Sequence, residues 1–162
     1  MSEASSPVSV RRAEAGDVPV IAALIAMGAA AGASDRGAAE AEGRHPAYLE
    51  AFALLEASSV NHLFVAERGG QVVGTYQLTI LPGIAQRGRI RGKIESVHVD
   101  PDIRSSGVGA VMMRHAVNTA RTWGVGLLEL TSDKRRVDAH RFYERLGFAR
   151  SHEGFKMVLD RG

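Results

Sequence analysis

The spacing of apolar positions along the chain switches several times between a period of two and a helical period. Val8–Arg12 alternates apolar with polar side chains, which predicts a first strand. Asp17 is placed to cap a helix whose apolar face lies within Val18–Ile25, and Pro46 opens a second helix. Between these helices, Gly28–Arg44 shows no period and predicts a mobile connection.

From residue 62 onward, short β-rich runs alternate with helical patterns. Strands are expected at 62–67, 71–81, 93–99, 127–131 and 155–159, with a tight hairpin turn between the first two. A helix follows the third of these strands and ends before Gly124, and another covers Ala139–Leu146. This order, without an internal repeat or a long linker, predicts one mixed α/β domain over residues 1–162, with residues 1–7 disordered.

Composition narrows the classes of protein that the chain can represent. It has no run of about 18 apolar residues for a membrane helix and no secretory signal, so we expect a cytoplasmic protein without a membrane partner. The absence of cysteine excludes disulfides and cysteine nucleophiles, and the six histidines are scattered, so no metal site is expected. A formal charge of +2 and an aromatic content of 6% give no reason to expect a nucleic-acid partner.

The most informative segment is Ile94–Met113, where a strand leads through a glycine-punctuated loop into a helix. The first amides of a helix lack intrahelical partners and lie at the positive end of its dipole, so they attract phosphate oxygens. Gly107 and Gly109 would let a diphosphate approach these amides, and Arg104–Ser106 adds one positive charge and two hydroxyl donors. The alternative is a tight strand-to-helix turn that needs glycine. Neither a P-loop nor a G-x-G-x-x-G motif is present.

Two stretches resemble the signatures of one enzyme family. Arg104–Gly109 reads RSSGVG and resembles the [QR]-x-x-G-x-[GA] motif of the GNAT acetyltransferases, and Asp138–Phe148 is similar to the A-x-x-F-Y-x-x-x-G-F run of that family's last helix. With both motifs in the family's order, the chain is identified as a member of the GNAT superfamily. The resemblance implies a single domain with a mixed, mostly antiparallel central sheet flanked by helices, and a homodimer by analogy. Arg136 departs from the pattern, because the family often has Asn there.

The resemblance also implies an acetyl-CoA-dependent N-acetyltransferase and assigns its residues. The backbone of Val97–Val99 would pair with the pantetheine arm, the Val99 amide would polarise the acetyl carbonyl, and Tyr143 would protonate the leaving thiolate as general acid. The expected cofactor contacts are Val97, His98, Val99, Arg104, Ser105, Ser106, Gly107, Val108, Gly109 and Ala110.

Direct acetyl transfer needs a base as well, because an alkylamine with a pKa of about 10 arrives protonated. Glu95 is the expected base, and the two-residue period of a strand places it on one face with Val97 and Val99. His98, or a water beside Ser96, are the alternatives for this role. Glu95 could instead be an exposed strand residue paired with a neighbouring cation, Arg91 or Lys93.

The acceptor is less well defined by the sequence than the cofactor site. The C-terminal stretch TSDKRRVDAHRFYERLGFARSHEGFK resembles aminoalkylphosphonate N-acetyltransferases. Acidic residues between the first two helices could attract an amine, and a basic group before the Glu95 strand could hold an anion: Asp35, Glu40 and Glu42, and Arg87, Arg89 and Arg91. Together they favour a small primary amine that is zwitterionic. A protein or peptide amine as acceptor, and a non-catalytic acyl-CoA-binding regulatory module, stay open as alternatives.

Overall fold

The structure is a computed structural model that describes residues 6–29 and 34–159. The disorder expected for residues 1–7 falls mostly on residues 1–5, which lie outside the described part. The chain divides into two compact units, Met1–Glu129 and Leu130–Gly162, and each is described by itself.

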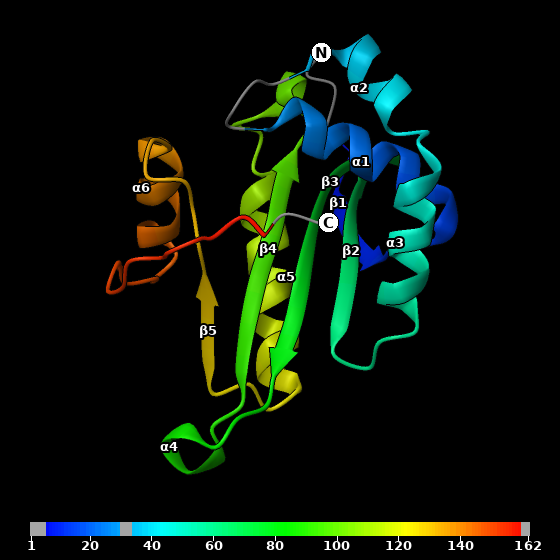
Figure 1. Ribbon diagram of the computed structural model, residues 1–162. Coiled ribbons are helices and arrows are strands. Elements are labelled where there is room, and N and C mark those ends of the chain that lie inside the picture. The colour runs from blue at the N-terminus through cyan, green and yellow to red at the C-terminus, as the bar shows by residue number, and fades with distance from the viewer. Residues whose placement is uncertain (1–5, 30–33, 160–162) are drawn as a thin grey trace. The chain divides into compact units, whose positions relative to one another are not determined.

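A sheet of five strands in the order β1-β2-β3-β4-β5 forms the centre of the first unit (Figure 1). The strands are β1 (Val8–Arg12), β2 (Asn61–Arg68), β3 (Gln71–Leu81), β4 (Arg91–Val99) and β5 (Leu127–Leu130). Antiparallel pairing joins β1 to β2, β2 to β3 and β3 to β4. The expected hairpin between β2 and β3 turns at Gly69 and Gly70, whose φ angles of 57° and 76° favour glycine.

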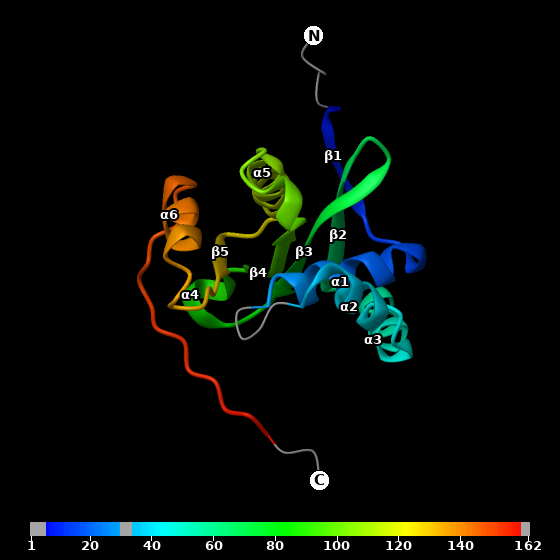
Figure 2. The same ribbon diagram turned by 90° about the horizontal axis from the view of Figure 1, so that it is seen from above.

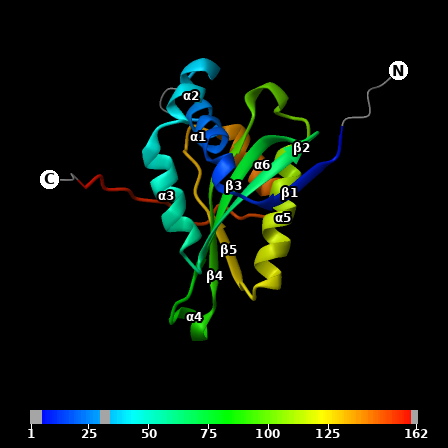
Figure 3. The same ribbon diagram turned by 90° about the vertical axis from the view of Figure 1, so that its right-hand side faces the viewer.

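Helices cover the two faces of this sheet, as Figures 2 and 3 show. On one face lie α1 (Val18–Met27), α2 (Arg36–Glu42) and α3 (Pro46–Glu56), and on the other lies α5 (Val108–Thr122). Single turns complete the unit at η1 (Ala15–Asp17), α4 (Ala85–Gly88) and η2 (Pro101–Ile103). The mixed α/β class with a flanked, mostly antiparallel sheet is confirmed.

The α5 side of the sheet holds the large buried side chains. Phe64, Tyr76, Leu78 and Ile94 are at most 4% exposed there, and Tyr76 stacks on Phe64 with ring centroids 5.0 Å apart. The Tyr76 hydroxyl lies 2.7 Å from Nδ1 of His115 on α5, and burial raises the pKa of Tyr76 well above its usual range. This polar contact anchors α5 against β3.

The stretch expected to be a mobile connection contains a helix. Asp35 caps α2 by accepting a hydrogen bond from the Ala38 amide at 2.9 Å. Ala39 is fully buried against α1, where it joins Leu24 and Met27 in one apolar cluster. The helix has seven residues and a single buried side chain, so it leaves no apolar period in the sequence.

The second unit contains α6 (Val137–Arg145), as expected, but the strand expected at 155–159 is wrong. Within its described residues, 149–159 forms neither helix nor strand, and Phe155 and Val158 are 94% and 90% exposed. A β-rich run becomes a strand only when another strand accepts its backbone hydrogen bonds. Apart from the end of β5, the described part of this unit supplies no such strand.

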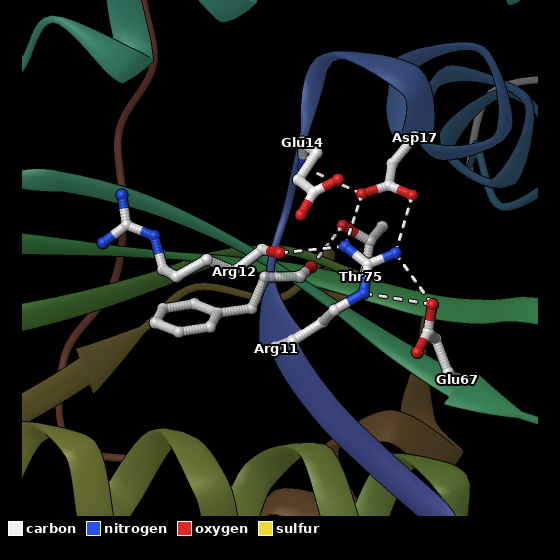
Figure 4. Close-up of polar contacts among 7 residues, drawn as sticks. Arg11, Arg12, Glu14, Asp17, Glu67 and Thr75 are labelled. Carbon is white, nitrogen blue, oxygen red and sulfur yellow. Dashed lines mark hydrogen bonds and ion pairs between the residues drawn. The ribbon is translucent and has the colours of Figure 1, made fainter. Parts of the chain in front are cut away.

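Arg11 ties the first two strands to the start of α1 (Figure 4). Its guanidinium donates to both carboxylate oxygens of Asp17, at 2.7 and 2.9 Å, and to Oε1 of Glu67 on β2, at 2.7 Å. Asp17 occupies the expected cap position of α1, but its carboxylate accepts from Arg11 and from the Glu14 amide rather than from the helix. These hydrogen bonds, that from Arg11 above all, lower the pKa of Asp17.

Asp17→Asn removes the charge that Arg11 holds and should lower the free energy of unfolding by about 2 kcal/mol at neutral pH. Because the folded pKa of Asp17 is lowered, its contribution is complete above the unfolded value of about 3.9 and is lost as the pH falls through the folded value. Denaturant unfolding should therefore give a higher free energy of unfolding for wild type than for Asp17→Asn at neutral pH, and the difference should disappear in acid. Asp138→Asn, in an exposed pair with Arg141 at 3.9 Å, is the control and should cost far less. An equal loss at both positions would contradict this account.

Candidate active site

An extra residue in β4 controls which side chains face the helices α1–α3. Gln77 of β3 pairs with Glu95, but Thr75 pairs with His98, so Ser96 and Val97 together lie opposite Tyr76. This is a β-bulge, and Ser96 adopts a left-handed φ of 51° within it.

The bulge corrects the expected arrangement of the base candidates. Gln77 and Thr75 point to one face of β3, so their partners Glu95 and His98 share that face of β4. Val99 pairs with Gly74, whose missing side chain faces Met112 of α5, so Val99 lies on the opposite face. The prediction that Glu95 shares a face with Val97 and Val99 is wrong, because strand alternation is interrupted between them.

Both base candidates therefore lie on the face that α1 covers. A Cβ atom at Gly28, the C-cap residue of α1, would clash with Nδ1 of His98, so only glycine lets the helix end this close to the ring. His98 is half-buried at this contact. The close fit fixes the end of α1 against the part of β4 that was expected to hold the pantetheine arm.

Glu95 forms an ion pair with Lys93 on the same face, with Oε1 and Nζ 3.0 Å apart. The Glu95 side chain is 40% exposed, so solvent and a ligand can reach it. The sequence analysis gave an ion pair with Arg91 or Lys93 as the alternative to a catalytic role for Glu95. The structure contains the pair with Lys93, and Glu95 is still accessible. A cation is thus placed directly beside the expected base.

Further polar side chains extend this surface across β3 and β2. Thr79 donates to Oδ1 of Asn61 at 2.8 Å, and the Gln77 amide donates to Thr79 at 3.2 Å. Thr79 pairs with Lys93 across the strands, as Gln77 does with Glu95. We call the set Asn61, Gln77, Thr79, Lys93 and Glu95 the polar row. It offers hydrogen-bond donors and acceptors, one positive charge and one negative charge on the α1–α3 side of the sheet.

The phosphate loop, Arg104–Gly109, leads from η2 into α5. Ser105 and Gly107 have φ angles of 66° and 86°, and this left-handed pair turns the chain sharply into the helix. Gly107 is the N-cap of α5 and has no side chain to cap the helix, and none of the hydrogen bonds among the described residues joins a side chain to its first amides. The amides of Val108, Gly109 and Ala110 are thus left for a ligand, so the loop fits a diphosphate. Among the expected cofactor residues, Val108 is buried and Arg104–Gly107 is exposed.

Arg36 joins the start of α2 to the turn that precedes this loop. One guanidinium nitrogen lies 2.7 Å from a carboxylate oxygen of Asp100 and 2.7 Å from one of Asp102. Burial by itself would raise the pKa of Asp100, but the hydrogen bonds from Arg36 and from the Asp102 amide together outweigh it and lower the pKa. A cleft of about 350 Å³ opens here, lined by Met27, Ser34, Arg36, Pro101, Asp102 and Arg104.

Tyr143 belongs to the second unit, so its surroundings are described within α6. Its ring packs edge-on against Phe142 and Phe148, with centroids 5.3 and 6.1 Å away. Burial raises the pKa of Tyr143, and the positive charge of Arg136 opposes that shift. The hydroxyl is therefore protonated at neutral pH and can donate a hydrogen bond. Its role as general acid stays a prediction.

The charged residues expected to bind the acceptor mostly have structural partners. Asp35 caps α2, and Glu42 accepts a hydrogen bond from the Tyr48 hydroxyl at 2.9 Å. Arg91 pairs with Glu129 of β5 at 3.2 Å, and the Arg89 side chain packs along Gly126. Lys93 is the cation that lies beside Glu95.

No helix within the described residues combines the length and the apolar character needed to cross a membrane. Over the same residues, no group of three or more His, Cys, Asp or Glu side chains could hold a metal ion.

Comparison with known proteins decides the family. The profile of the acetyltransferase (GNAT) family matches residues 32–148, which include the phosphate loop and all of α6. The chain belongs to the GNAT acetyltransferase family. The family predicted from the two motifs is therefore confirmed.

Individual relatives agree with this assignment. An aminoalkylphosphonate N-acetyltransferase of Salmonella typhimurium is 36% identical over 98 residues, 60% of this chain and 63% of that protein. A glucosamine 6-phosphate N-acetyltransferase of Trypanosoma brucei brucei is also 36% identical, over 64% of this chain and 67% of its own. This chain thus spans less than two thirds of the length of the Salmonella protein. A crystal structure described as a transcriptional regulator from Bacillus halodurans C-125 superposes with a TM-score of 0.83 at 34% identity, covering 94% of this chain and all of that one.

Two arginines near the site were missed by the reasoning from sequence. Arg36 and Arg68 contact the segment between β4 and α5 from positions far away in the chain. Neither belongs to a motif, and local spacing carries no signal for a contact across 64 or 38 residues.

Gly28→Ala should move the His98 ring or the end of α1 and destabilise the fold by about 1–3 kcal/mol, because the added methyl group has no room. Thermal unfolding measures this loss. Gly16→Ala is the matched control, since a Cβ at Gly16 meets no atom within 4 Å, and it should leave the midpoint nearly unchanged. Equal midpoints for the two variants would show that the contact between α1 and His98 is not tight.

Proposed function

We propose that this GNAT protein is an acetyl-CoA-dependent N-acetyltransferase that acetylates the primary amine of a small molecule carrying an anionic group. The observation that carries the proposal is the arrangement along β4. The bulge turns Glu95 and His98 to the α1–α3 face, and the same strand leads through η2 into the phosphate loop, where α5 begins without a side-chain cap.

The cofactor part of the proposal assigns the diphosphate to the phosphate loop and the start of α5. Arg104 contributes charge, Ser105 and Ser106 contribute hydroxyl donors, and Val108–Ala110 contribute amides. When bound, the thioester supplies the acetyl group. The bulge at Ser96 and Val97 leaves backbone groups of β4 outside the β3 ladder, which supports pairing of this stretch with an extended pantetheine arm.

The proposed chemistry transfers one acetyl group and removes two protons from the acceptor ammonium. Glu95, directly or through a water, accepts the proton of the acceptor ammonium, so that the neutral amine attacks the thioester carbonyl. The amide of Val99 donates to the carbonyl oxygen as negative charge develops. As the C–S bond breaks, Tyr143 donates its proton to the thiolate, and the attacking nitrogen loses its second proton to solvent, from which Tyr143 is protonated again.

The polar row supports an acceptor that carries both charges. Lys93 lies 3.0 Å from Glu95, so an anionic group held by Lys93 would bring its own amine to the carboxylate. The names of two relatives point the same way, since an aminoalkylphosphonate and glucosamine 6-phosphate each combine a primary amine with a phosphorus oxyanion. Lys93 takes the anion-binding role that the sequence had suggested for Arg87, Arg89 and Arg91.

A matched pair of amines tests this substrate class. With 2-aminoethylphosphonate, kcat/KM should exceed that for n-propylamine by about tenfold or more, since one charge-assisted contact contributes roughly 1.5 kcal/mol or more. Thiol release from acetyl-CoA measures both rates, and Lys93→Met should remove most of the preference. A preference for polyamines, or equal rates on the matched pair, would contradict the anionic acceptor. Binding of acetyl-CoA without turnover on any small amine would favour a protein acceptor or a regulatory module.

Glu95→Gln tests the base. The variant should lose about 100-fold or more in kcat while retaining its affinity for acetyl-CoA. Its remaining activity should rise with pH toward the pKa of the amine, about 10, because the free amine must then come from solution. Glu129→Gln is the matched control, a strand glutamate in an ion pair with Arg91, and should keep near wild-type kcat. A pH profile of Glu95→Gln that is parallel to wild type would assign the base elsewhere.

A further inference from the structure

Arg68, the last residue of β2, contacts the phosphate loop from outside every family motif. Its Nη1 lies 3.1 Å from the Ser106 hydroxyl oxygen and its Nη2 lies 3.2 Å from the Ser106 carbonyl oxygen. One guanidinium thus holds both the side chain and the backbone of a single loop residue. Ser106 directly precedes Gly107, the left-handed N-cap of α5.

The direction of these hydrogen bonds determines what the Ser106 hydroxyl can do. A guanidinium has donors only, so Ser106 accepts from Arg68 through its oxygen. The hydroxyl has one proton of its own, which is left to donate to another group. Arg68 therefore holds Ser106 in the state in which it donates to an acceptor such as a phosphate oxygen.

Within the described residues, no carboxylate pairs with the charge of Arg68. Arg11 and Arg36 each bind two carboxylates. Among the residues that the structure describes, no carboxylate lies within 4.0 Å of a nitrogen of Arg68. Its Nε is buried and has no hydrogen-bond partner in that part of the chain. A buried donor on an unpaired cation is costly unless an anion comes near it.

We propose that Arg68 is a positioning residue for the diphosphate of acetyl-CoA, acting through Ser106 and through its uncompensated charge. The inference rests on the proposed function, since it takes the ligand of the loop to be a diphosphate. It extends the cofactor site to a residue of the β2–β3 hairpin, 38 positions before Ser106.

Calorimetric titration with CoA tests the proposal on the full chain. Arg68→Met should weaken CoA binding by about tenfold or more, from the loss of charge and of the fixed Ser106 donor. Arg68→Lys, which keeps the charge but not the two-point contact, should fall between Met and wild type. Ser106→Ala should also weaken binding, and the double variant should lose less than the two single losses combined, because one acts through the other.

A donor without phosphates separates this role from a purely structural one. With acetyl-pantetheine as acetyl donor, Arg68→Met should keep the wild-type KM, since no diphosphate is present. Arg121→Met is the matched control, an exposed arginine in the last turn of α5, about 20 Å from the loop at 1.5 Å per residue, and it should bind CoA as wild type does.

The outcomes distinguish the two proposals. Wild-type protein that binds CoA, with Arg68→Met binding it equally well, would overturn the role of Arg68 alone. Equal losses with CoA and with acetyl-pantetheine would also overturn it, because they would make Arg68 structural. Wild-type protein that does not bind CoA would overturn the proposed function, and this inference with it.

Discussion

The β-bulge in β4 is the constraint on which the site depends. One extra residue, taken up at Ser96 and Val97, puts Glu95 and His98 on the face that α1 covers and leaves Val99 on the face of α5. A regular strand would place Glu95 and His98 on opposite faces, because alternation has a period of two. The bulge also bends the strand just before the phosphate loop. The proposed base and the approach to the phosphate loop thereby lie on one stretch of chain, from β4 through η2.

The arginines near β4 and the phosphate loop differ in whether a carboxylate pairs with them. Arg11 and Arg36 are neutralised by carboxylates and hold secondary structure together, whereas Arg68 and Arg104 form no ion pair within the described residues and lie at or beside the phosphate loop. The net charge of +2 hides this difference, since it sums paired and unpaired cations alike. Opposite charges also meet at Lys93 and Glu95, on the face where an acceptor would bind. Two arginines without an ion pair in the described residues thus lie where a diphosphate would bind.

The features predicted correctly from the sequence are those that a local pattern of residues determines. The glycine signals at Gly69 and Gly70 and the apolar face of α5 gave the hairpin and the helix correctly, and two spaced motifs gave the family. Prediction from the sequence failed where structure depends on distant partners. The helix α2 buries a single side chain, that of Ala39, and residues 155–159 need a strand to pair with. Arg68 reaches Ser106 from 38 positions away in the chain. The bulge was missed because Ser96 carries no turn signal, although its φ is left-handed.

Amide chemical shifts, followed as CoA is added to the isotope-labelled protein, test the central claim most directly. The account predicts that the largest changes fall on residues 104–110 and 97–99, because the loop amides and the bulged end of β4 are assigned to the cofactor. Smaller changes are expected for the distant end of α5 and for β1. Changes concentrated elsewhere, with the loop amides unmoved at saturation, would contradict the account.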